Sequence, residues 1–184
     1  EAAGAFAPLL TLAPPLETAA ATPGGVPGTA LDLLAVSAAW DEFVVGRWAD
    51  WLASAGDPGA LALHLRMERW ALDELALPGR LFADVVQALY RDDAFFRGTL
   101  VVEGRPLGPS FLVTSLLAVI DPSSRVVPPA SVVPFLEAAA SRDVGVLEYR
   151  REAGVGFQHV GPLVGRGAHR HLWPRILAWV AERA

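Results

Sequence analysis

Two short apolar runs in the last third of the sequence constrain the fold more than any other feature. The first, residues 116–120, contains no polar residue and is followed directly by Asp121 and Pro122. The second, residues 144–149, comes after a segment with a helical pattern. Strands with so few polar positions are typical of parallel sheets that are covered on both faces. The sequence therefore predicts a strand–helix–strand unit and an α/β fold class.

A carboxylate and an imidazole follow these two predicted strands. Asp121 stands at the end of the first strand, and His159 lies in the glycine-flanked segment 156–161 that precedes the last helix. Functional groups of parallel sheets lie just beyond the carboxyl ends of the strands. An acid that precedes a histidine along the chain is also the order found in α/β-hydrolases. We therefore expect His159 to act as a general base and Asp121 to orient it.

The rest of the chain predicts further strands around a long helical block. Residues 7–13 are apolar and are followed by two prolines, which favours a short buried strand. Residues 29–97 carry apolar side chains at three- and four-residue steps, and Asp57-Pro58 is typical of a helix start. Residues 99–103 predict a small strand of the same sheet. The helical block would then be an insertion, and lids over active sites are found in such insertions.

The last third predicts two more helices. Residues 128–141 begin with two prolines and continue with a helical pattern, and a final helix tolerates Pro174 because this residue falls in its first turn. The final helix is expected to bury four apolar residues: Leu172, Ile176, Leu177 and Val180.

Composition excludes several classes of function. The chain of 184 residues suits one domain, and its net charge of −5 without a Lys/Arg block makes nucleic acid an unexpected partner. No apolar run approaches the roughly 20 residues of a membrane span. The first residues lack the basic flank and apolar core of a signal peptide, so a cytoplasmic location is expected. With no cysteine, the sequence has neither disulfides nor a cysteine nucleophile.

The other histidines do not predict a metal or cofactor site. His169 and His171 are expected to be exposed near a helix start, and no suitably spaced carboxylate completes a metal site with them. His64 falls in the helical block and is expected to be structural. The sequence therefore predicts no bound metal and no redox cofactor.

Several stretches follow one another at distances that match a known family. They are Leu65-Arg66-Met67-Glu68-Arg69-Trp70, Leu89-Tyr90-Arg91-Asp92-Asp93, Arg125-Val126-Val127-Pro128-Pro129, His159-Val160-Gly161 and Leu172-Trp173-Pro174. In this order they resemble the C-terminal half of polyhydroxyalkanoate synthases, most of all the two-subunit kind, and their α/β-hydrolase relatives. The resemblance covers essentially the whole chain. The Met-Glu-Arg-Trp and His-Val-Gly stretches are its most specific parts.

The resemblance implies a partial α/β-hydrolase fold that lacks its N-terminal half. Residues 1–28 would supply a strand and loop of the core, residues 29–98 a helical cap, and residues 99–184 the C-terminal part of the core. In this family a nucleophilic cysteine takes a 3-hydroxyacyl group from coenzyme A, and a histidine deprotonates it with help from an aspartate. His159 matches the position of that base. Coenzyme A would be a substrate carrier here, and no cofactor is implied.

Two departures from the family pattern matter. The Gly-x-Cys-x-Gly-Gly nucleophile turn, or its serine equivalent, does not occur in this sequence. We therefore expect a preceding segment or a second chain to supply the nucleophile, which also allows homo- or hetero-oligomers. Ser124 stands where the family has its aspartate, with two residues between it and the Val-Pro-Pro of residues 127–129, and Asp121 lies three positions before Ser124. Asp121 could act from this shifted position, because triads are defined by geometry.

Two alternatives to an acyltransferase remain open at this stage. The chain could belong to an ester or thioester hydrolase of the same fold. It could also be a catalytically silent, synthase-like scaffold that binds polymer granules or a catalytic partner. A nucleophile turn with cysteine favours the synthase, one with serine the hydrolase, and one with neither the scaffold. The identity of the nucleophile and the acyl length of the substrate stay open.

Overall fold

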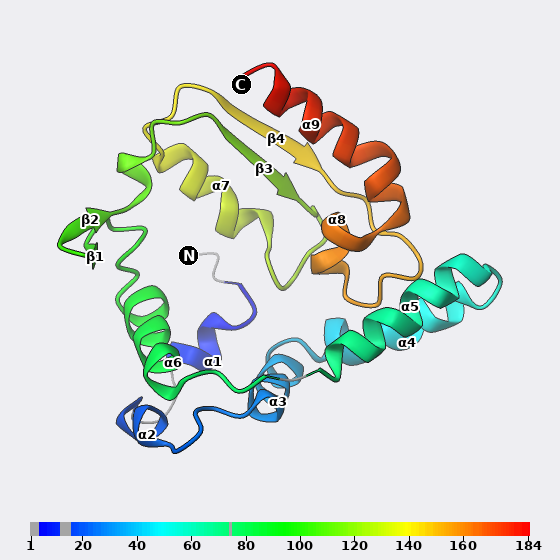
Figure 1. Ribbon diagram of the computed structural model, residues 1–184, viewed down its shortest axis with the longest axis horizontal. Helices are drawn as coiled ribbons and strands as arrows, with labels where there is room; N and C mark the ends of the chain where they lie inside the picture. Colours follow the sequence, from blue (N-terminus) through cyan, green and yellow to red (C-terminus); the bar gives the residue numbers. More distant parts are fainter. Residues whose placement is uncertain (1–3, 12–15, 74) are drawn as a thin grey trace.

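The computed structural model describes residues 4–11, 16–73 and 75–184 (Figure 1). Its α-helices are α1 (Ala7–Thr11), α2 (Leu16–Ala21), α3 (Gly28–Ala38), α4 (Gly46–Ser54), α5 (Pro58–Ala71), α6 (Gly79–Val85), α7 (Pro129–Ala138), α8 (Gly161–Val164) and α9 (Trp173–Ala181). Its π-helical and 3-10 segments are η1 (Asp41–Val45), η2 (Val86–Arg91), η3 (Pro109–Phe111), η4 (Gln158–Val160) and η5 (Ala168–Leu172). Its strands are β1 (Leu100–Val102), β2 (Arg105–Leu107), β3 (Leu116–Ile120) and β4 (Val144–Glu148).

A small parallel sheet organises the last third of the chain. Strand β3 pairs with β4 in parallel, with Leu116 opposite Val144 and Ile120 opposite Glu148. Helix α7 connects the two strands, and α9 runs beside β4 (Figure 1). The predicted strand–helix–strand unit is therefore confirmed, and the architecture is mixed helix and sheet, compatible with an α/β class.

The covering of this sheet differs from the prediction. The C-terminal helices bury Tyr149 and Leu172 against Val119 and Leu147. Side chains of β4 point alternately to the two faces of the sheet. Those on the face away from these helices include Val144 and Val146, which are 42% and 47% exposed. The prediction that both faces are covered is therefore wrong for β4 in the described structure.

The final helix also buries less than predicted. Leu172 is buried and Ile176 is partly buried, as expected, but Leu177 and Val180 are 60% and 50% exposed. Because a helix turns about 100° per residue, Leu177 points away from the face that Ile176 presents to the sheet. Pro174 lies in the first turn of α9, as predicted.

The N-terminal strand predicted over residues 7–13 is wrong where the structure describes it. Residues 7–11 form α1, and residues 12 and 13 lie outside the described residues. Leu10 packs against Val86 of η2, and Phe6, one helical turn before Leu10, joins the same cluster. A short apolar run does not distinguish a buried strand from one face of a helix, and here packing on η2 favours the helix.

The predicted small strand exists, but it does not belong to the parallel sheet. Strand β1 pairs antiparallel with β2 to form a separate hairpin. Its turn residues Glu103 and Gly104 have φ of 50° and 77°, as a tight two-residue hairpin loop requires. The helical block is therefore not enclosed by two strands of one sheet in the described structure. Whether residues 29–98 act as a cap remains a prediction.

The helical block forms as predicted and contacts the sheet-bearing part of the chain through α5. Asp57 caps α5 by accepting hydrogen bonds from the backbone N–H groups of Gly59 and Ala60. Further along α5, Leu63 and Met67 lie about one turn apart and pack against Val155 and Phe157 in the loop that follows β4. This cluster joins the helical block to the segment that carries His159.

Candidate functional site

His159 lies in η4, in the loop between β4 and the C-terminal helices. Its imidazole is partly buried against two phenyl rings, one from the distant η1 segment and one from its own loop. The ring centroids of Phe43 and Phe157 lie 5.6 Å and 6.2 Å from that of His159, in tilted and edge-on arrangements. One edge of the imidazole is therefore enclosed by apolar surface.

A pocket of about 450 Å³ opens beside this histidine. Its apolar lining comes mainly from α3, the end of α5 and the His159 loop: Leu31, Ala35, Val36, Trp70 and Phe157. Charged side chains line the rest: Asp32, Arg47 and Asp73. Pockets that bind small molecules are concave and mostly apolar, with few polar groups at defined positions. This pocket offers an aliphatic or acyl group a place next to a titratable imidazole.

The pKa of His159 is lowered from the ordinary histidine value. The largest cause is burial, because the apolar surroundings disfavour the charged imidazolium. The carboxylate of Glu42 acts in the opposite direction, and the guanidinium of Arg151 lowers the pKa further. The neutral imidazole, which is the form that accepts a proton, is therefore favoured at neutral pH.

Asp121 lies at the carboxyl end of β3, as predicted, and its carboxylate is buried. Oδ1 accepts hydrogen bonds from the backbone N–H and the hydroxyl of Ser123, at 2.9 Å and 2.7 Å. Oδ2 accepts from Nε of Arg151 at 2.7 Å. Arg151 also donates to both carboxylate oxygens of Glu42, at 2.8 Å and 3.2 Å. Two carboxylates are thus held by one guanidinium.

Asp121 and His159 follow neighbouring parallel strands, but no hydrogen bond joins them in the described part of the chain. Arg151 occupies the carboxylate of Asp121, and both Arg151 and Glu42 act electrostatically on His159. Asp121 is thus hydrogen-bonded to Arg151, whose charge in turn acts on His159. Its assignment as the orienting acid stays a prediction.

Ser124 has a local structural role. Its side chain is buried, and its hydroxyl accepts a hydrogen bond from the backbone N–H of Val127 at 3.0 Å. The hydroxyl therefore stabilises the turn between β3 and α7. The same turn is braced by the Ser124 backbone N–H, which donates to the carbonyl of Asp121.

The loop that carries His159 is held by its own polar side chains. Gln158 donates to the carbonyl of Glu152 and accepts from the hydroxyl of Tyr149. Glu152 accepts from the backbone N–H groups of Gly167 and Ala168, at 2.6 Å and 3.0 Å. These bonds connect the loop to the start of the C-terminal helices and fix the path of the chain on both sides of His159.

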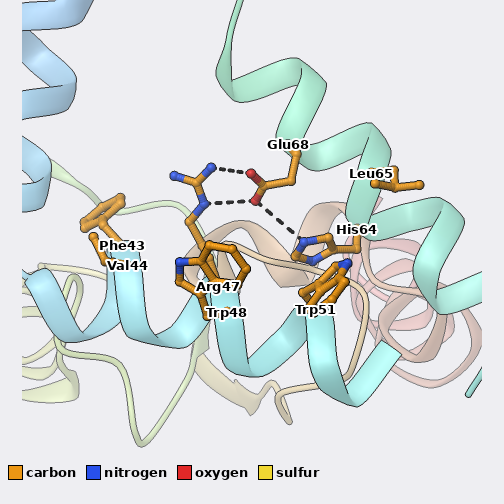
Figure 2. Close-up of a pocket in the computed structure, with 8 residues that line it drawn as sticks. All are labelled: Phe43, Val44, Arg47, Trp48, Trp51, His64, Leu65 and Glu68. Atoms are coloured by element: carbon orange, nitrogen blue, oxygen red, sulfur yellow. Dashed lines mark hydrogen bonds and ion pairs between the residues drawn. The ribbon is translucent and has the colours of Figure 1, made fainter. Parts of the chain in front are cut away.

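A second polar cluster lies in the helical block (Figure 2). Asp50 and His64 are both buried, with Asp50 Oδ2 lying 2.7 Å from His64 Nδ1. On the other side of the ring, Nε2 of His64 lies 3.8 Å from Oε1 of Glu68, whose carboxylate forms a two-point ion pair with Arg47. His64 is therefore structural, as predicted.

This cluster borders a second pocket, of about 580 Å³. Trp48, Trp51 and Leu65 form its apolar walls (Figure 2). Phe43 and Arg47 line both pockets, so the two pockets adjoin at this pair of side chains.

Sequence reasoning found His159 and Asp121 but missed the residues that set their surroundings. Glu42 and Phe43 come from a segment more than a hundred positions before His159, and Arg151 lies between Asp121 and His159 in the chain. Phe157 is near enough in sequence to have been considered, because an aromatic residue two positions before a loop histidine is a visible feature. Nothing local marks the other three, since their roles depend on tertiary packing.

The described residues show no metal-binding cluster and no membrane-spanning helix. His169 and His171 are exposed in η5, as predicted. In the ranges the structure describes, no group of three or more histidine and acidic side chains is arranged to hold a metal ion. No helix in these same ranges is long and apolar enough to cross a membrane.

Comparison with known proteins identifies relatives of one kind. Over 161 residues the chain is 23% identical to the poly(3-hydroxyalkanoate) polymerase subunit PhaC of Haloarcula marismortui, covering 88% of this chain and 33% of that protein. It is 26% identical to the PhaC subunit of Haloferax mediterranei over 65% of this chain and 23% of that protein. It is 23% identical to the PhaC subunit of Allochromatium vinosum over 91% of this chain and 46% of that protein.

These matches extend over most of this chain, which spans between about a quarter and a half of the length of the relatives. No family model matches the sequence, and no solved structure matches it. The resemblance that the sequence motifs predict is nevertheless confirmed, because the relatives agree in name and the matches cover both the helical block and the His159 loop. Over most of its length the chain is similar to the PhaC subunits of poly(3-hydroxyalkanoate) polymerases.

Proposed function

We propose that this chain supplies the general base and the acyl pocket of a 3-hydroxyacyl transferase, and that its nucleophile comes from polypeptide outside these residues. The observation that carries the proposal is the position of His159, which has a lowered pKa and lies beside a partly apolar pocket of about 450 Å³. The relationship to PhaC subunits supports acyl transfer as the reaction class.

In the proposed reaction, neutral His159 takes the proton from a cysteine thiol or serine hydroxyl. The resulting anion attacks the carbonyl carbon of a 3-hydroxyacyl-coenzyme A thioester, and a tetrahedral intermediate forms. The carbon–sulfur bond then breaks, and the leaving coenzyme A thiolate takes the proton back from the imidazolium. The acyl group stays on the nucleophile, with its aliphatic part in the pocket. Glu42 stabilises the transient imidazolium through its charge.

The predicted acid, Asp121, is not hydrogen-bonded to His159 in the described structure. Asp121 fits the family order of acid and base, but it holds Arg151, which in turn holds Glu42. We propose that Asp121 acts on His159 indirectly, because it fixes the positions of Arg151 and Glu42. A direct role would require a hydrogen bond from the imidazole of His159 to the Asp121 carboxylate, which already accepts hydrogen bonds from Ser123 and Arg151.

Exposed surface supports the presence of further polypeptide around this chain. The solvent-accessible area is 11467 Å², whereas a folded monomer of 19.5 kDa exposes about 8,500 Å². Among the described residues, the buried apolar side chains form three small clusters, and large apolar residues such as Trp48, Trp51 and Leu52 are exposed. We propose that the segment or chain that carries the nucleophile covers these exposed surfaces and completes an α/β-hydrolase fold. We also propose that the assembled protein is located in the cytoplasm, in association with polymer granules.

A silent scaffold is the second candidate, and one observation favours it. The carboxylate of Asp121 is engaged by Arg151 and does not touch His159. A hydrolase of the same fold would use the same base and differ only in passing the acyl group to water.

The first test is an intact mass of the native material, with N-terminal sequencing of every chain that co-purifies. The same material is then incubated with a radiolabelled 3-hydroxyacyl-coenzyme A and separated under denaturing conditions. We expect label on a cysteine of a longer precursor or of a second chain, and loss of that label in His159→Gln. Label on a serine that water releases favours the hydrolase. A lone 19.5 kDa species without label contradicts the proposal and favours the scaffold.

A further inference from the structure

We propose that Asp50 and His64 are positioning residues that fix the loop carrying His159, acting through a continuous set of contacts from α4 and α5 to the imidazole. The catalytic consequence rests on the proposed role of His159, whereas the positioning itself does not.

The anchor of this network is the buried carboxylate of Asp50 on α4. Oδ1 accepts a hydrogen bond from the backbone N–H of Gly154 at 2.9 Å, and Oδ2 accepts one from Gly156 at 2.9 Å. The donors lie more than a hundred positions further along the chain, in the loop after β4. A buried carboxylate is tolerated only where hydrogen bonds replace its hydration, and here the loop backbone supplies two of them.

The loop is shaped to close around this carboxylate. Gly154 and Gly156 have φ of 93° and 70°, a region that other residues rarely adopt, and Val155 between them is completely buried. A side chain at Gly154 would also place its Cβ 2.5 Å from the carbonyl oxygen of Ala60 on α5. The loop therefore fits α4 and α5 in one conformation, with both N–H groups directed at Asp50.

His64 extends the network from Asp50 towards the site. Its Nδ1 lies 2.7 Å from Asp50 Oδ2, in the geometry of a donor to that carboxylate, and its Nε2 faces Glu68 (Figure 2). Glu68 holds Arg47 in a two-point ion pair. The guanidinium of Arg47 in turn lies 4.8 Å from the ring centroid of Phe157, in a cation–π contact.

Phe157 completes the path, because its ring packs edge-on against the imidazole of His159. The same ring is buried and contacts Phe43, which is the other aromatic neighbour of His159. The network thus acts on His159 from two sides. It holds the loop backbone through Asp50, and it holds the aromatic wall through Arg47.

The test uses a matched pair of substitutions at His64 in the protein as isolated, with every chain that co-purifies. His64→Asn retains a donor near the Nδ1 position, whereas His64→Leu has nearly the same size and no donor. The imidazole of His159 is observed by NMR of histidine-labelled protein and assigned by the loss of its signal in His159→Gln. His171→Leu, at an exposed histidine outside the network, is the control.

We expect His64→Leu to shift the ring signals of His159 and to move its titration midpoint towards that of an ordinary histidine. His64→Asn should restore most of the difference, and His171→Leu should change neither. In acyl transfer, His64→Leu should lower kcat by about 100-fold with little change in KM, since misplaced catalytic groups cost rate more than binding. A folded His64→Leu protein whose His159 signals and titration match the wild type would overturn the proposal.

A second variant decides the case if His64→Leu does not fold. Glu68→Gln acts on a partly exposed carboxylate and removes its charge from Arg47 with little change in size. Shifted His159 signals in this variant support the network, and unchanged signals overturn it. The NMR measurement needs no catalytic activity. A wild type without acyl transfer would therefore refute the proposed function and leave the result on positioning readable.

Discussion

Arg151 Nε lies 2.7 Å from Oδ2 of Asp121, so the carboxylate that the sequence predicts as the partner of His159 is already paired with a guanidinium. Arg151 also binds Glu42, which carries the charge that favours the imidazolium of His159. The side chain of Asp121 is 6% exposed and that of Arg151 is 33% exposed. The pair is therefore shielded enough to contribute to stability, although the exposure of Arg151 limits the size of that contribution.

Replacement of either partner should reveal this anchoring role. We expect Asp121→Asn and Arg151→Met each to lower the free energy of unfolding by about 1–3 kcal/mol, because a buried charged group loses its partner. Combined, they should cost about 1 kcal/mol less than the sum, as coupled neighbours do. Urea unfolding of the two single variants and the double variant measures this coupling. Additive costs, with a rate loss of orders of magnitude in Asp121→Asn alone, would instead identify Asp121 as the acid that acts directly on His159.

The lowered pKa of His159 predicts the pH dependence of acyl transfer. Because the base must be neutral, the acidic limb of kcat/KM should fall below pH 6.5, the ordinary histidine value. Glu42→Gln removes a carboxylate that raises this pKa, so the limb should move to lower pH. Arg151→Met removes a positive charge that lowers this pKa, so the acidic limb should move to higher pH. Rate profiles of the three proteins between pH 4.5 and 8, roughly the range in which histidines titrate, measure these shifts. A limb above pH 6.5, or shifts of opposite sign, would contradict the assignment.

The same pKa has a consequence for stability, and its sign is opposite to that of a paired histidine. The unfolded state binds a proton to His159 more readily than the folded state does. The contribution of this site is therefore complete above pH 6.5 and is lost as the pH falls through the lower pKa of the folded protein. In His159→Gln, the decrease in the free energy of unfolding over this range should be smaller. Urea unfolding at several pH values provides the comparison, and identical pH dependence in both proteins would argue against the buried neutral form.

Features encoded by short sequence patterns were predictable. The strands β3 and β4, the Asp57 cap of α5 and the position of Pro174 in α9 each depend on a few consecutive residues. Features that depend on tertiary packing between distant segments were not predictable from the sequence. The run at residues 7–11 became a helix because Leu10 packs on Val86, a residue that no local pattern connects to it.

The candidate site likewise combines a residue that the sequence predicts with surroundings that depend on tertiary packing. His159 stands out in the sequence because it lies between glycines in the loop after a strand, and its place in the structure agrees with that prediction. Its electrostatic surroundings come from Glu42, more than a hundred residues earlier, and from Arg151, which binds both Glu42 and Asp121. The binding of two distant carboxylates by one arginine is a tertiary effect, and spacing in the sequence contains no information about it.

Gly161, directly after the His159-Val160 pair, should not tolerate a side chain. A Cβ built there lies 2.1 Å from the hydroxyl oxygen and 2.4 Å from Cζ of Tyr149, whose ring is buried and cannot give way. We expect Gly161→Ala to lower the free energy of unfolding by about 1–3 kcal/mol, as overpacking does in a close-packed interior. Gly56→Ala is the control, because nothing lies within 4 Å of the added carbon and the backbone is not left-handed there. Equal stability of the two variants would show that Tyr149 does not pack as the structure has it.

The pocket beside His159 should set the length of acyl chain that the protein accepts. Ala35 on α3 lines this pocket without touching the imidazole, so Ala35→Phe should fill part of its volume of about 450 Å³. We expect KM to rise by about tenfold or more for longer 3-hydroxyacyl thioesters and to change little for the shortest one, since each lost methylene contact is worth about 1 kcal/mol. The matched control is Ser37→Phe, on the same helix at an exposed position that does not line the pocket. Steady-state rates over a series of acyl lengths separate the two variants. If Ala35→Phe lowers the rate for every length alike, or if Ser37→Phe has the same effect, the acyl group does not occupy this pocket.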